Sequence, residues 1–88
     1  MATTELQSRW RKKNRFSKKQ LNIMARWLVH EDLDELAATY ELRGKGEAVA
    51  FSSFLAKGLT QYAERDANAR ELISIFTEAY RRDRDLYT

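Results

Sequence analysis

The chain has 88 residues, a formal net charge of +3, and neither cysteine nor proline. The absence of cysteine excludes a disulfide scaffold, a thiol nucleophile and a cysteine-ligated zinc site. The length allows one domain with a small hydrophobic core, and we expect a homodimer, whose shared interface would enlarge that core.

Hydropathy and composition bear on the compartment. No apolar stretch approaches the roughly 18 residues that a membrane-spanning helix requires. The first residues lack the apolar region of a signal peptide, and small secreted domains usually depend on disulfides. We therefore expect no membrane partner and an intracellular location, either cytoplasmic or on the nucleoid or in the nucleus.

The positive charge is concentrated near the N-terminus. Residues 1–19 carry seven basic residues and one acidic residue, a net +6, whereas residues 20–88 carry nine basic and twelve acidic residues, a net −3. This asymmetry is typical of a basic arm attached to a separately folded unit. The sequence therefore predicts a flexible basic arm at residues 1–15 and a single helical domain at residues 16–88.

The first predicted helix starts directly after the arm. Ser17 and Gln20 have the spacing of a capping box, and Phe16 and Leu21 have that of a hydrophobic staple. Apolar residues then recur at helical spacing. These signals predict a helix over residues 17–29.

The apolar stripe changes register beyond that point. The segment VHED, residues 29–32, predicts a kink or break, because the next stripe is rotated from the first. Several acidic residues follow, and the helix dipole favours negative charge in a first turn. A second helix is expected over residues 31–42, continuous with the first if the break is only a kink.

Two glycines in RGKG, residues 43–46, form the strongest interior break. The apolar face that follows predicts a helix over residues 46–65. Asn68 and Glu71 have capping-box spacing and predict a last helix over residues 69–85. The expected fold is therefore all-α, a small bundle of three to four helices.

Residues 20–29 also alternate between apolar and polar side chains, as in a short strand. A strand, a helix, a glycine-containing turn and a second helix resemble the ribbon-helix-helix DNA-binding regulators over about residues 20–63. The resemblance implies an alternative fold, with a strand at residues 20–28 paired with that of a second chain. The outward side chains that would then read bases are Gln20, Asn22, Met24 and Arg26.

The basic arm is the strongest candidate for a functional site. Closely spaced cations neutralise phosphates and release counterions, and interleaved aromatic rings stack on bases. We therefore expect a small nucleic-acid-binding regulator or accessory factor, with DNA favoured over RNA. The expected nucleic-acid-binding residues are Arg9, Trp10, Arg11, Lys12, Lys13, Arg15, Lys18 and Lys19.

An alternative hypothesis is a protein–protein adaptor or inhibitor. A small protein with an acidic helical surface and exposed aromatic residues can act by docking on a larger protein. The expected partner-binding residues are Glu31, Asp32, Asp34 and Glu35.

No motif supports catalysis. His30 lies near several acidic residues, but one histidine without cysteine is too small a set to indicate a metal site. RGKG lacks the spacing of a phosphate-binding loop, and Ser52 and Ser53 have no histidine or lysine partner at a telling spacing. We expect neither a cofactor nor enzymatic activity.

Overall fold

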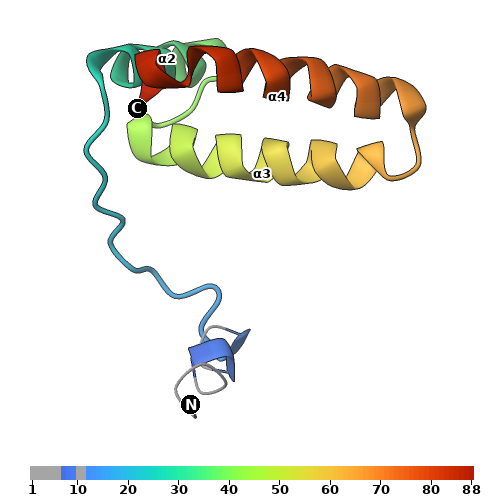
Figure 1. Ribbon diagram of the computed structural model, residues 1–88. Coiled ribbons are helices and arrows are strands. Elements are labelled where there is room, and N and C mark those ends of the chain that lie inside the picture. Colours follow the sequence, from blue (N-terminus) through green and yellow to red (C-terminus); the bar gives the residue numbers. More distant parts are fainter. Residues whose placement is uncertain (1–6, 10–11) are drawn as a thin grey trace.

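Three long helices make up the body of the protein (Figure 1). The computed structural model describes residues 7–9 and 12–88. The described residues contain no strand, which confirms the all-α prediction and leaves the ribbon-helix-helix alternative, with its strand at residues 20–28, unsupported. The long helices are α2 (Trp27–Thr39), α3 (Lys45–Ala63) and α4 (Ala67–Tyr87).

The helix predicted over residues 17–29 is wrong for most of its length. Residues 18–26 are extended, and Arg26, with ψ of 155°, leads directly into α2. The amide of Ser17 closes a turn by donating to the carbonyl of Asn14 at 2.9 Å. A capping box contributes about 1 kcal/mol, which does not nucleate a short helix that lacks a surface to pack on.

The break predicted at residues 29–32 is also wrong. α2 passes through this segment without interruption and begins four residues before the predicted helix over 31–42. The apparent shift of register arises because the first stripe belongs to the extended segment and only the second belongs to a helix. α2 ends before Glu41, whose positive φ of 55° is incompatible with a continuing right-handed helix.

The break predicted at residues 43–46 is confirmed. Gly44 has φ of 155°, a value that residues with a Cβ atom rarely adopt, and α3 starts at the next residue. Arg43 secures the turn, because its amide donates to Oε1 of Glu47 at 2.8 Å and its Nη2 donates to Oε2 at 3.1 Å.

The turn between α3 and α4 is held by side chains at both helix ends. The cap of α4 is Asp66 and not the predicted Asn68, because Oδ1 of Asp66 accepts from the amide of Ala69 at 2.9 Å. Arg70 donates from Nε to the carbonyl of Ala63 at 3.1 Å and from Nη2 to that of Glu64 at 3.3 Å. These bonds satisfy two carbonyls that the end of α3 leaves free.

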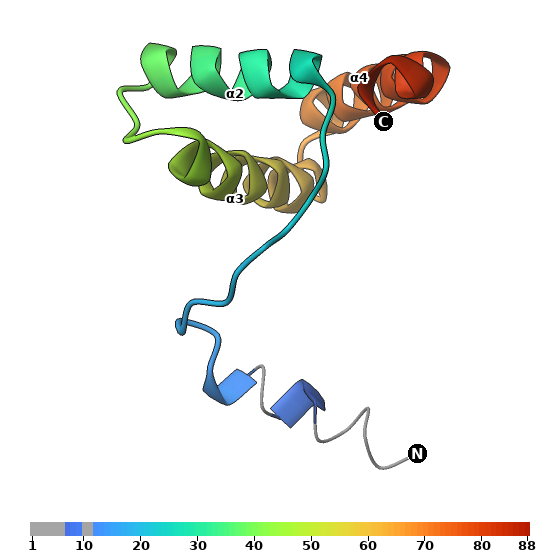
Figure 2. The same ribbon diagram turned by 90° about the vertical axis from the view of Figure 1, so that its left-hand side faces the viewer.

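α3 is the central element, since it packs against both α2 and α4. α3 and α4 lie side by side in opposite directions (Figure 1), and α2 lies across α3 in the turned view (Figure 2). The ring of Tyr40, just after α2, contacts that of Phe51 on α3, with 4.8 Å between their centroids.

Three helices in this open arrangement cover little apolar surface. Among the described residues only Ala48 and Ala63 are buried, and no large side chain is fully buried. The radius of gyration is 16.1 Å, against about 12 Å for a compact domain of this length. The extended segment accounts for part of this difference, and the shallow packing of the helices accounts for the lack of a core.

Phe51→Ala should destabilise the protein, because it removes the ring that contacts Tyr40. We expect the free energy of unfolding to fall by about 2 kcal/mol, less than for a fully buried phenylalanine. Urea unfolding followed by circular dichroism measures it. Phe54→Ala is the matched control, since Phe54 lies on the same helix and is 79% exposed. The control should change stability by less than about 0.5 kcal/mol, and an equal loss in both variants would contradict the assigned packing.

The stability of the α3–α4 turn should depend on pH through Asp66. The amide of Ala69 and the hydroxyl of Tyr62 both donate to its carboxylate, and they hold the pKa of Asp66 below its ordinary value of 3.8. This contribution is therefore fully present above pH 3.8 and is lost as the pH falls through the lowered pKa of the folded state.

Asp66→Asn keeps an acceptor oxygen but does not titrate. Thermal unfolding from neutral pH to about pH 2 should therefore show a smaller acid loss of stability in this variant than in the wild type. An identical acid loss in both proteins would show that Asp66 does not contribute.

Candidate nucleic-acid interface

The structure places the basic side chains of the arm in solvent. Residues 7–9 and 12–13 are helical, a turn follows, and the extended segment begins at residue 18. Two of the predicted residues, Trp10 and Arg11, lie outside the described residues. The predicted cations that the structure describes are all exposed: Arg9, Lys12, Lys13, Arg15, Lys18 and Lys19.

An aromatic ring lies among these cations. Phe16 is 92% exposed, and the guanidinium carbon of Arg15 lies 5.3 Å from its ring centroid. An exposed ring covered by an arginine is a platform on which an unpaired base can stack. Phe16 therefore offers, within the described residues, the stacking chemistry that the sequence assigned to Trp10.

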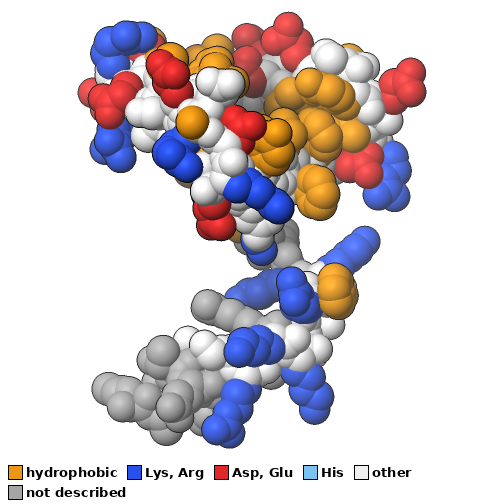
Figure 3. Space-filling model, turned by 90° about the vertical axis from the view of Figure 1, so that its right-hand side faces the viewer, with side chains coloured by type: hydrophobic (Ala, Val, Ile, Leu, Met, Phe, Trp, Pro, Cys, Tyr) orange, Lys and Arg blue, Asp and Glu red, His pale blue; other side chains and the backbone are white. Residues whose placement is uncertain are grey.

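The described residues of the arm lie away from the helical body (Figure 3). Figure 3 shows blue basic side chains around the arm and a mixture of red and blue side chains on the helical body. The described basic residues of this segment, Arg9, Lys12, Lys13, Arg15, Lys18 and Lys19, therefore project into solvent, and residues 20–88 carry a net charge of −3. A polyanion can therefore approach the arm without meeting the acidic residues of α2.

The base of the arm meets the body at one described cavity. Lys18 lines it together with the turn before α3 and the first residues of that helix, and its volume is about 530 Å³. The proximity of Lys18 to this turn was not predicted from the sequence. The only indication was the pair of glycines in RGKG, which leave the backbone of the turn without bulky side chains. The other residues that line the cavity are Arg43, Gly44, Gly46, Glu47 and Ala50.

Charge in this cavity is partly compensated. The backbone amide of Arg43, and then its guanidinium, hold the pKa of Glu47 below its ordinary value of 4.5. Nearby, Nζ of Lys45 lies 3.8 Å from Oδ2 of Asp34. Of the cations around this turn, Lys18 is the one for which the described residues show no ion pair.

The predicted partner-binding acids lie on α2, and of the four only Asp32 and Glu35 line a common depression. Glu31, Asp34 and Glu35 are exposed and Asp32 is half-buried, and Asp34 faces Lys45, the first residue of α3. Asp32 and Glu35 line a shallow depression of about 350 Å³ together with Leu36 and Thr39.

His30 lies beside Trp27 in the first turn of α2. Its ring lies 5.6 Å from that of Trp27, and its Nδ1 is buried without a hydrogen-bond partner among the described atoms. No group of three or more potential metal-binding side chains occurs in the described part of the chain.

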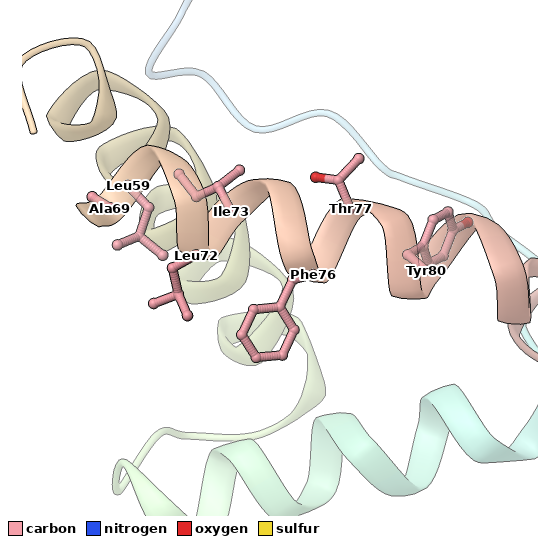
Figure 4. A pocket seen from close by; sticks show the side chains of 7 residues that line it. All are labelled: Leu59, Ala69, Leu72, Ile73, Phe76, Thr77 and Tyr80. Atoms are coloured by element: carbon pink, nitrogen blue, oxygen red, sulfur yellow. The ribbon is translucent and has the colours of Figure 1, made fainter. Parts of the chain in front are cut away.

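An apolar groove of about 410 Å³ runs between α3 and α4 (Figure 4). Leu72 and Phe76 project from one side of α4, and Ile73 and Thr77 project from the other side. Phe76 is 68% exposed, so the groove is a surface feature and not an enclosed ligand cavity. The groove is lined by Leu59, Ala69, Leu72, Ile73, Phe76, Thr77 and Tyr80.

Comparison with protein-family models, with curated proteins and with solved structures found no match to this chain. The described helices also include none that is long and apolar enough to cross a bilayer. What can be inferred about function therefore depends on the residues described above.

Proposed function

We propose that this protein is a small, non-enzymatic nucleic-acid-binding factor whose N-terminal arm holds the phosphate backbone. The observation that carries the proposal is the set of exposed cations among the described residues of the arm and its junction, Arg9, Lys12, Lys13, Arg15, Lys18 and Lys19, in a chain whose body has a net negative charge. Such an arm gains affinity by releasing counterions from the polyanion. It positions the protein on nucleic acid without reading a base sequence.

Two further features support this proposal. Phe16, with Arg15 over its ring, supplies a stacking platform within the cationic run. Lys18 extends the positive surface to the cavity at the start of α3. We propose DNA as the main target and regulation or an accessory role as the context.

The direct test is fluorescence anisotropy of labelled duplex DNA and single-stranded RNA over a salt series. The full chain should bind, and its affinity should fall steeply with salt. A form lacking residues 1–15 should bind much more weakly. Absence of binding by the full chain at about 0.15 M salt would contradict the proposal.

Lys12→Gln/Lys13→Gln/Arg15→Gln should make the salt dependence shallower. Because each phosphate contact contributes about 0.9 to the slope of log K against log salt, three lost contacts should reduce it by about 2–3. The measurement is the same anisotropy series on duplex DNA. The matched control, Lys57→Gln/Arg65→Gln/Arg81→Gln, removes three exposed cations from the body. A similar reduction in both triple variants would show that net charge, and not the arm, governs binding.

The second candidate function is docking on a larger protein. It is favoured by the depression on α2, whose rim carries Asp32 and Glu35 around the half-buried Leu36. A basic peptide segment with an apolar residue fits this chemistry. This candidate predicts negligible nucleic-acid binding by the full chain. It also predicts that Asp32→Lys/Glu35→Lys abolishes binding to the larger protein, whereas loss of residues 1–15 does not.

A further inference from the structure

α4 carries an apolar stripe that the described part of the chain covers only in part, although Leu72 and Phe76 also line the groove beside α3. Leu72, Ile75, Phe76 and Leu86 are between 54% and 68% exposed. Ala79 continues the stripe at helical spacing, and we call these five residues the outer stripe of α4. Apolar side chains aligned in this way along a 21-residue helix favour contact with another helix.

The exposed area of the whole chain indicates how large a partner it can accommodate. Its accessible surface is 8,536 Å², whereas a compact protein of this mass exposes about 5,400 Å². The extended arm accounts for part of the difference, and the uncovered helix faces account for the rest. A standard interface covers about 800 Å² on each partner, so the chain has sufficient area for one.

The charges beside the outer stripe indicate which partner fits. Glu71, Ile75, Glu78 and Arg82 follow one another at spacings of four, three and four residues, so they share one side of α4. The acids lie toward the start of this row and Arg82 lies at its end. Two parallel copies of α4 would oppose like charges, whereas two antiparallel copies centred on the middle of the helix oppose Glu71 to Arg82 and place Glu78 level with Ile75.

We propose that a second copy of this chain covers the outer stripe, with the two α4 helices antiparallel about a two-fold axis at the middle of the helix. This arrangement brings Glu71 of each copy opposite Arg82 of the other. Both charges are available for it, because the one ion pair described for Arg82 is with its sequence neighbour Asp83, at 3.4 Å and largely exposed, and none is described for Glu71.

A depression beside the stripe supports the same arrangement. It is lined by Ser74, Ile75, Glu78, Ala79 and Arg82. In the antiparallel pair, Ile75 of one copy lies over this depression of the other copy. The contact is isologous, since the same residues serve both subunits, and it therefore closes as a dimer and does not propagate.

Sedimentation equilibrium without nucleic acid, combined with a charge exchange, tests this pairing. The wild type should be a dimer. Glu71→Arg and Arg82→Glu should each raise the dissociation constant of the dimer by about tenfold or more. Each variant places two pairs of like charges across the axis. The double variant Glu71→Arg/Arg82→Glu should restore dimerisation. A mixture of the two single variants should also associate, because every opposed pair then carries opposite charges.

Lys57→Glu is the matched control. It makes the same change of charge at an exposed residue of α3, for which the described residues show no ion pair. This variant should dimerise like the wild type, and circular dichroism should show equal helix content in all the variants. A monomeric wild type, or single variants that are not rescued by the exchange or by mixing, would overturn the proposal.

Discussion

The packing of α3 against two neighbours is the constraint on which the rest of this structure depends. α2 and α4 both contact this one helix, and the only buried side chains in the described residues are the alanines Ala48 and Ala63. Arg43 and Asp66 make hydrogen bonds in the turns at the two ends of α3, so the backbone path between consecutive helices is fixed by local contacts. Three helices joined in this way form a scaffold with large apolar faces still open to solvent.

The two proposals, an arm that binds nucleic acid and a body that forms a dimer, are compatible. The described cations of the arm lie in solvent, and the helical body leaves apolar faces exposed. In the proposed dimer, two arms would bind one nucleic acid and the number of phosphate contacts would double. Joining two weak binding segments in this way raises the affinity without any new type of contact.

The sequence allowed the helical fold to be predicted where glycine and capping chemistry act locally. The break at RGKG was predicted because Gly44 needs a backbone that other residues rarely adopt. The prediction of a helix over residues 17–29 was wrong. Ser17 and Gln20 have capping-box spacing, but the segment has no surface to pack on. Local signals of about 1 kcal/mol do not determine the structure of such a segment.

The candidate site was predictable in part, because the residues of the basic arm are close together in the sequence. A run of cations is visible in the sequence, and the structure shows the described members exposed. The proximity of Lys18 to the start of α3 was not predictable, because it depends on the direction in which residues 18–26 leave the body. An apolar stripe on the last helix was visible in the sequence, but the periodicity of a helix alone does not separate the face toward α3 from a face left uncovered.

The central claim is that a single chain leaves its helices incompletely covered and that a second chain supplies the missing contacts. Thermal unfolding at about 2 µM and at about 200 µM protein tests this most directly, because association with the folded state makes its stability depend on concentration. The midpoint should rise by about 5–10 °C over this range. A midpoint that does not change with concentration would show that the chain is stable alone and would contradict the claim.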